Sequence, residues 1–153
     1  MRTIKMKKLL FMFCILVSSA TFAAKESIYT KKAPNPIGTY SQAIKIGNTV
    51  YISGQIPIDP KTGEIVKGNF DDQVKQSLSN VNEIVKAAGG NIDDIVKVSV
   101  YLSDINNFAR LNEEMKAMFH LPYPARSVVE IKSLPKNAMV EIEAVMQLDD
   151  NFN

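Results

Sequence analysis

The stretch from Phe70 to Leu102, FDDQVKQSLSNVNEIVKAAGGNIDDIVKVSVYL, changes its apolar period once, and this change decides the fold class. Apolar residues first recur every three or four positions as far as Ala88, which predicts an amphipathic helix that the Gly-Gly pair at 89–90 ends. From Val96 onward apolar and polar residues alternate, which predicts a half-buried strand. A helix followed directly by a strand indicates a fold that mixes the two.

Segments on both sides extend this pattern. Residues 43–53 (AIKIGNTVYIS) form two β-rich runs around Gly47 and Asn48, which accept positive φ and predict a two-residue hairpin. Asp104 is placed to cap a second helix. We expect its apolar stripe to be core packing; it consists of Phe108, Leu111, Met115 and Met118 or Phe119.

The C-terminal part predicts two more strands, residues 126–131 and 139–148. In the second strand alternate apolar residues share one face, while Glu141 and Glu143 share the other. We expect the two strands to form a hairpin that brings Arg126 near the strand with the glutamates. The whole order predicts an α+β fold with two helices packed on one face of a mixed sheet.

Residues 1–23 have the pattern of a secretory signal peptide. Basic residues without an acid precede the apolar run LLFMFCILV at 9–17, and small residues follow it. That run is too short to cross a bilayer, which needs about 20 residues. We expect cleavage after Ala23, a single domain over residues 24–153, and a soluble periplasmic or secreted protein. The alternative is an ordinary N-terminal helix.

Cleavage there changes the charge of the chain and removes its one cysteine, Cys14. Four of the 18 Lys and Arg residues leave, so 14 remain against 16 acidic residues and the net charge moves from +2 to −2. A negative chain without a basic cluster disfavours a nucleic-acid partner. A single His and a single Cys supply no standard zinc ligand set, so no metal is expected.

Familiar catalytic motifs do not account for a function. The sequence has neither G-x-S-x-G nor G-x-G-x-x-G, and the phosphate-loop spacing at residues 63–68 has Asn69 in place of the required lysine. His120 lies between two apolar residues at a predicted helix end, which favours a helix-terminal role. Paired acids such as those at 71–72 and 93–94 favour helix starts over metal ligands.

Two placements remain unusual. Arg126 begins a strand directly after Pro124-Ala125, and arginine holds a carboxylate through two parallel hydrogen bonds. A structural cross-strand pair of Arg126 with a glutamate, stabilising by about 0.5 kcal/mol, is the alternative that the pattern alone favours. Tyr40 and the Ser53-Gly54 pair flank the predicted hairpin, where a glycine allows close approach of a ligand or makes an ordinary turn.

Taken in order, these segments resemble the reactive intermediate/imine deaminase family, the RidA or YjgF-type proteins that are also described as endoribonuclease L-PSP-like. The similarity runs from about residue 28 to 148. The motifs that carry it are IGTYSQ (37–42), SGQIP (53–57), TGE (62–64), AAG (87–89), DIVK (94–97), NFA (107–109), Asn112, PARS (124–127), LP (134–135) and VEIE (140–143).

The resemblance implies a chorismate mutase-like fold and a homotrimer with sites between subunits. It implies hydrolysis of enamines and imines such as 2-aminoacrylate to a 2-keto acid and ammonia, without a cofactor. Arg126 matches the clamp for the substrate carboxylate, and Glu141 matches the acid that positions the attacking water. The remaining matched substrate-binding positions are Tyr40, Ser53, Gly54, Asn112 and, through its backbone, Val128.

The sequence departs from the family in several places. Thr39 stands where the family usually has proline, Val128 where some bacterial members have cysteine, and the connection over 119–124 is short. The export signal is the largest departure, since members are typically cytosolic. Two alternatives to catalysis on imines are a binding-only or holdase-type protein with a small-carboxylate cleft, and an endoribonuclease.

Overall fold

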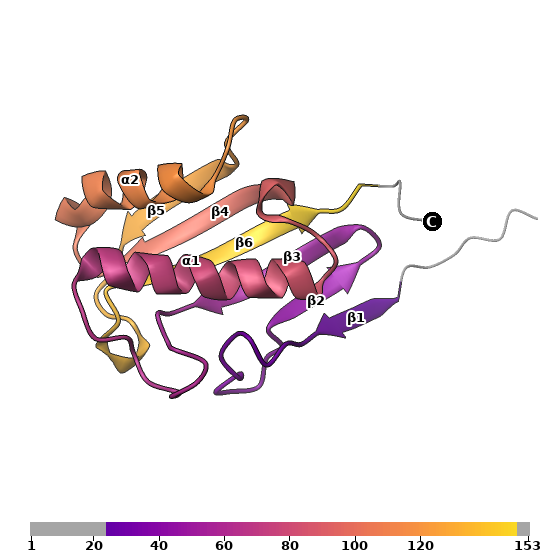
Figure 1. The fold of residues 1–153 in the computed structure, drawn as a ribbon, viewed down its shortest axis with the longest axis horizontal. Helices are drawn as coiled ribbons and strands as arrows, with labels where there is room; N and C mark the ends of the chain where they lie inside the picture. The colour runs from indigo at the N-terminus through magenta and orange to yellow at the C-terminus, as the bar shows by residue number, and fades with distance from the viewer. Residues whose placement is uncertain (1–23, 150–153) are drawn as a thin grey trace, which may run out of the picture.

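Within residues 24–149, six strands form one mixed sheet, and both α-helices of that range pack against the same face of it (Figure 1). The computed structural model describes residues 24–149 of the 153-residue chain, so the predicted signal peptide lies outside the described residues. The elements are β1 (Lys25–Ile28), β2 (Ala43–Ile46), β3 (Thr49–Gln55), α1 (Phe70–Ala87), η1 (Ile92–Asp94), β4 (Ile95–Leu102), η2 (Ile105–Asn107), α2 (Phe108–Met118), β5 (Ala125–Glu130), η3 (Pro135–Asn137) and β6 (Val140–Gln147).

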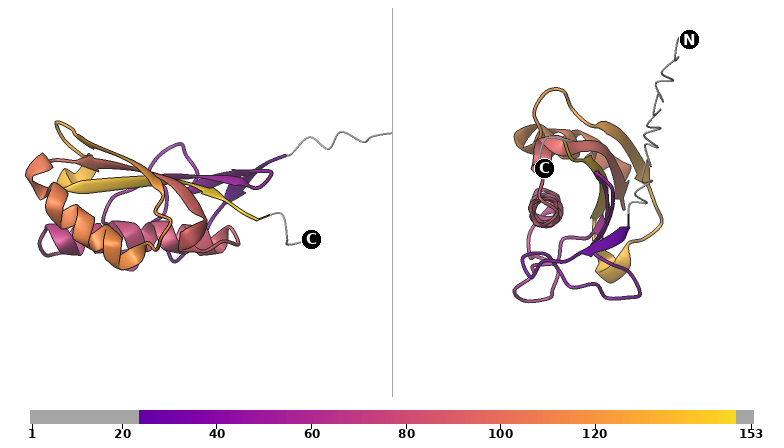
Figure 2. Two further views of the ribbon diagram at one scale, coloured as in Figure 1. Left: turned by 90° about the horizontal axis from the view of Figure 1, so that it is seen from above. Right: turned by 90° about the vertical axis from the view of Figure 1, so that its right-hand side faces the viewer.

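Figure 2 shows the helices and the sheet from the side as two layers, and the main core cluster lies between them. Along β6 the side chains of Val140, Ile142, Ala144 and Met146 are buried, and those between them are half-buried on the other face. This alternation confirms the predicted pattern of the last strand. The α+β architecture, the hairpin of β2 and β3, and the helix that ends before Gly89 are confirmed as well.

The predicted hairpin of the last two strands is wrong. The strand order is β1-β2-β3-β6-β4-β5, so β6 lies inside the sheet, antiparallel to both β3 and β4. β5 forms the edge and runs parallel to β4. The helix α2 supplies the crossover that two parallel strands require. The side chains of β5 are mostly exposed, which suits an edge, whereas β6 buries every second residue and suits the interior.

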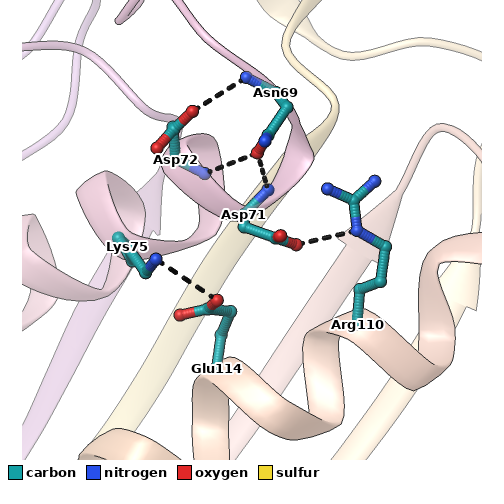
Figure 3. A network of polar contacts seen from close by, with 6 residues as sticks. All are labelled: Asn69, Asp71, Asp72, Lys75, Arg110 and Glu114. Atoms are coloured by element: carbon teal, nitrogen blue, oxygen red, sulfur yellow. Dashed lines mark hydrogen bonds and ion pairs between the residues drawn. The ribbon is translucent and has the colours of Figure 1, made fainter.

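The start of α1 is fixed by a capping box that also ties the two helices together (Figure 3). The Asn69 side chain accepts hydrogen bonds from the backbone N–H groups of Asp71 and Asp72, and Asp72 Oδ2 accepts the Asn69 N–H at 2.9 Å. The Asp71 carboxylate then pairs with Arg110 of α2 at 2.8 Å. The acids at 71–72 thus act at a helix start, as predicted.

The region before α2 differs from the prediction in detail. Asp104 accepts a hydrogen bond from the Asn106 N–H at 2.9 Å and so caps the short 3₁₀ turn η2 rather than α2 itself. Phe108 of the predicted apolar stripe is 40% exposed, while Leu111 and Met115 are buried. The sequence analysis also missed β1, an edge strand that buries only its last residue.

Candidate active site

Arg126 lies at the start of β5 in a cleft of about 410 Å³ beside α2. Its Nη1 donates to the Met115 sulfur at 3.2 Å, and its guanidinium lies 5.4 Å from the centre of the Phe108 ring. Among residues 24–149 no carboxylate forms an ion pair with Arg126, so the structural Arg–Glu pair favoured by the pattern is wrong. The other residues lining this cleft are Asn112, Met115, Lys116, Phe119, Tyr123 and Pro124.

The Arg126 guanidinium contacts the Met115 sulfur and the Phe108 ring, and none of its donors is paired with an acid of residues 24–149. Such a guanidinium can form two parallel hydrogen bonds to an incoming carboxylate. The cleft beside it is lined mainly by apolar side chains, while Arg126 itself is exposed to solvent. Its chemistry fits a small molecule with one carboxylate and an apolar remainder.

Glu141 lies in a second cleft, of about 450 Å³, where β3 and β6 meet the loop at 34–42. Here the structure brings together four of the residues that the family resemblance matched to a site. They are Tyr40, Ser53, Gly54 and Glu141.

Gly54 is what lets the Glu141 carboxyl reach its position. The pairing of β3 with β6 shifts register between Ile52 and Gln55, so Ser53 and Gly54 form a bulge opposite Glu143, the neighbour of Glu141 on the same face of β6. A Cβ atom at position 54 would overlap the Glu141 carboxyl group. The group that comes close to the Gly54 backbone is therefore the Glu141 side chain of the same cleft.

The surroundings of Glu141 in the second cleft make its ionisation less favourable than that of a free glutamate. Partial burial, and next to it the charge of Glu143, raise the pKa of Glu141 above its usual range. Glu143 itself accepts a hydrogen bond from the Tyr101 hydroxyl at 3.1 Å. Burial, followed by Glu143, also raises the pKa of Tyr101, which keeps this phenol a donor.

The loop that carries Tyr40 is fixed by the buried side chain of Gln42. Its Oε1 accepts the Thr30 N–H at 2.7 Å, and its Nε2 donates to the carbonyls of Thr30 and Pro34, each at 2.9 Å, and of Ala33 at 3.3 Å. The Ser53 hydroxyl donates to the Ser41 carbonyl at 2.7 Å. The sequence analysis missed this anchoring role of Gln42.

The two clefts lie on opposite faces of the sheet. Arg126 is paired in register with Val98, whose side chain is buried under the helices, and it contacts α2. Glu141 is paired with Tyr101, on the face that the helices leave open. One chain therefore places Asn112 with Arg126 but holds both apart from Glu141 and its neighbours.

Two further predicted positions have simpler surroundings. Val128 packs against the core under the helices and lines neither cleft. His120 is exposed, and its Nδ1 lies 3.0 Å from Asp93 Oδ1. Over residues 24–149 no three His, Cys, Asp or Glu side chains gather as a metal site, and no helix in that range is long and apolar enough to cross a bilayer.

Known proteins are similar to this chain in sequence and in fold. The profile of the endoribonuclease L-PSP family matches residues 30–147. The human 2-iminobutanoate/2-iminopropanoate deaminase is 48% identical over 118 residues, which cover 77% of this chain and 86% of the human protein.

Solved structures of the same kind share the fold. RidA from an Antarctic Psychrobacter superposes with a TM-score of 0.78 at 48% identity, over 80% of this chain and 99% of that one. Escherichia coli TdcF with bound serine superposes with a TM-score of 0.76 at 42% identity, over 81% and 99%. Their fold agrees with the chorismate mutase-like fold that the resemblance implies. The chain belongs to the endoribonuclease L-PSP family, the RidA/YjgF family that its ordered motifs resemble.

Proposed function

We propose that this protein is an exported deaminase that hydrolyses 2-imino acids and their enamine forms, such as 2-aminoacrylate, to 2-keto acids and ammonia without a cofactor. The observation that carries the proposal is Arg126, a guanidinium in an apolar cleft with no carboxylate partner within residues 24–149. Relatives 45–48% identical bear the name 2-iminobutanoate/2-iminopropanoate deaminase, which supports this substrate class.

The reaction asks little of the protein beyond orientation. An imine protonated at nitrogen is already electrophilic, and Arg126 holds the neighbouring carboxylate in one orientation. Glu141 holds water and takes one of its protons as the C–O bond forms and the C=N π electrons move to nitrogen. Glu141 then returns the proton to nitrogen, the C–N bond breaks, and the hydroxyl oxygen forms the ketone as it loses its proton to solvent.

We further propose that the site is built between copies of the chain, as a homotrimer. Arg126 and Glu141 lie on opposite faces of one sheet, so no side-chain rotation within one copy joins them. Arg126 lies on the edge strand β5, with mostly exposed neighbours. An Arg126 cleft of one copy set against the Glu141 cleft of the next would bring both groups to one substrate.

The first test is a coupled assay in which 2-aminoacrylate is generated in place and keto-acid formation is followed. Wild type should exceed the spontaneous rate, and Arg126→Ala should lose about 100-fold or more in kcat/KM, since the carboxylate clamp is gone. Circular dichroism and light scattering should show that the variant keeps its fold and its oligomer size. A folded Arg126→Ala with full activity would overturn the proposal.

A mixing experiment tests the shared site. Arg126→Ala and Glu141→Gln are each expected to be inactive, but after subunit exchange about one site in four pairs an intact Arg126 with an intact Glu141. The mixture should then recover about a quarter of the wild-type activity. No recovery, with exchange verified by mass spectrometry, would mean that each site lies within one chain.

Export has its own support and test. The first strand begins at Lys25, directly after the expected mature residue Ala24, so cleavage after Ala23 leaves every described strand complete. Mass spectrometry of protein from the native source should give an N-terminus near Ala24. An intact Met1 would refute export.

A binding-only protein is the second candidate, because TdcF was solved with a bound serine. The same Arg126 cleft would hold an amino-acid or keto-acid carboxylate without turnover. Calorimetry that shows keto-acid binding, together with an imine hydrolysis rate equal to the spontaneous one, would favour this candidate.

A further inference from the structure

Beside Glu141, the open face of the sheet holds a second carboxylate that the proposed reaction does not use. Glu143 follows two residues later on β6, so its side chain projects from the same face and lines the same cleft. The Tyr101 hydroxyl, from the neighbouring strand β4, donates to Glu143 Oε1 at 3.1 Å.

The hydrogen bond gives the two glutamates different surroundings. Glu143 accepts a hydrogen bond from the Tyr101 hydroxyl, which fixes the position of its carboxylate. The Glu141 carboxyl accepts no hydrogen bond within residues 24–149, lies against Gly54 and is partly removed from water. A second carboxylate fixed on the same face and in the same cleft makes loss of the Glu141 proton less favourable.

We propose that Glu143, held by Tyr101, is a positioning residue whose fixed negative charge makes Glu141 the proton-carrying member of the pair. This role rests on the proposed deaminase reaction, in which Glu141 must both accept a proton and return it. Such a carrier works best when neither its acid nor its base form dominates strongly at the working pH.

Few other charges face the pair. Apart from the two glutamates, the titratable residue lining the cleft is Tyr40, from the loop. From β3 the cleft receives the uncharged Ser53 and Gly54. From β4, Lys97 lines a small neighbouring cleft with Glu143, and its Nζ lies 3.3 Å from Ser127 Oγ and in no ion pair within residues 24–149. The dominant charge acting on Glu141 is therefore Glu143, consistent with the raised pKa of Glu141.

The test is a titration of the purified protein labelled with ¹³C at glutamate side-chain carboxyls, the Glu141 signal being assigned by its loss in Glu141→Gln. In Glu143→Gln the Glu141 midpoint should move to lower pH, because the neighbouring negative charge is gone. In Tyr101→Phe, which releases the Glu143 side chain from its donor, the Glu141 midpoint should move part of the way in the same direction. Glu26→Gln, on exposed β1, removes the same charge far from the pair and should leave the Glu141 midpoint in place.

Kinetics connect the pair to the reaction. The acid limb of the kcat/KM profile should move to lower pH in Glu143→Gln, with kcat/KM about threefold lower at neutral pH. An unmoved Glu141 midpoint in folded Glu143→Gln would overturn the inference, whatever the enzyme's substrate. A moved midpoint in a protein without deaminase activity would instead overturn the proposed function and leave the coupling established.

Discussion

Replacing Gly54 by alanine tests the site through a single methyl group. A Cβ at this position would overlap the Glu141 carboxyl, while the backbone of Gly54 is not in the positive-φ region that favours glycine. The added methyl therefore meets only the end of a side chain. That end can rotate away at low cost to the fold, but the rotation moves the Glu141 carboxyl out of its position in the cleft.

Gly54→Ala should change the stability of the protein much less than its activity. Overpacking in a rigid core costs about 1–3 kcal/mol, and a flexible obstacle places Gly54→Ala at or below about 1 kcal/mol of unfolding free energy. A displacement of a catalytic group by about 1 Å can reduce the rate about 100-fold. We expect kcat/KM to fall by that order, with the urea midpoint changed little.

The assay is imine hydrolysis by wild type, Gly54→Ala, Glu141→Gln and the double variant, beside urea unfolding of each. If the methyl acts by displacing Glu141, it should cost almost nothing further in the Glu141→Gln background. Gly38→Ala is the matched control, since a Cβ there meets the Tyr40 ring at an ordinary 3.4 Å. Full losses that add in the double variant would refute the reasoning, as would full activity in Gly54→Ala.

Three further predictions concern stability. Gln42→Ala breaks four hydrogen bonds of a buried side chain and should lower the unfolding free energy by about 2–4 kcal/mol in urea titrations. Asn69→Ala removes the cap of α1 and should lower the unfolding free energy by about 1 kcal/mol, measured as a lower urea midpoint. An unchanged midpoint would mean that the capping box does not stabilise the fold. Because folding raises the pKa of Glu141, its ionisation destabilises the native state as pH rises, so Glu141→Gln should be more stable than wild type at neutral pH. That advantage should vanish below the ordinary glutamate pKa, and an equal advantage at both pH values would contradict the linkage.

The sequence predicts those elements whose apolar pattern lies within the element itself. The periods of α1, β4 and β6 are written in consecutive residues, since each element buries one side along its own length. Which strands become neighbours depends on long-range pairing, and the short connection between β5 and β6 suggested a hairpin that does not form. β1 has four residues with one buried, too short to show a period.

For the candidate site, the sequence indicated which residues to consider but not how they are arranged. Motif order identified Arg126, Asn112, Tyr40 and Glu141, because these residue types stand in recognisable strings. Their separation into two clefts depends on the parallel register of β5 and on the central place of β6, which no string reveals. The bulge at Ser53-Gly54 could be suspected from the glycine in a strand, but its partner could not.

The topology has a consequence for any reaction that needs both Arg126 and Glu141. Register fixes Arg126 beside Val98 and Glu141 beside Tyr101, and successive residues of one strand project from opposite faces. Moving either side chain to the other face would require a one-residue slip of its strand, which would also expose the buried residues of that strand. Loss of the core makes such a slip unavailable to the native state. If activity requires both groups, we expect it to arise from contact between copies and to fall on dilution below the dissociation constant of the assembly while each chain stays folded.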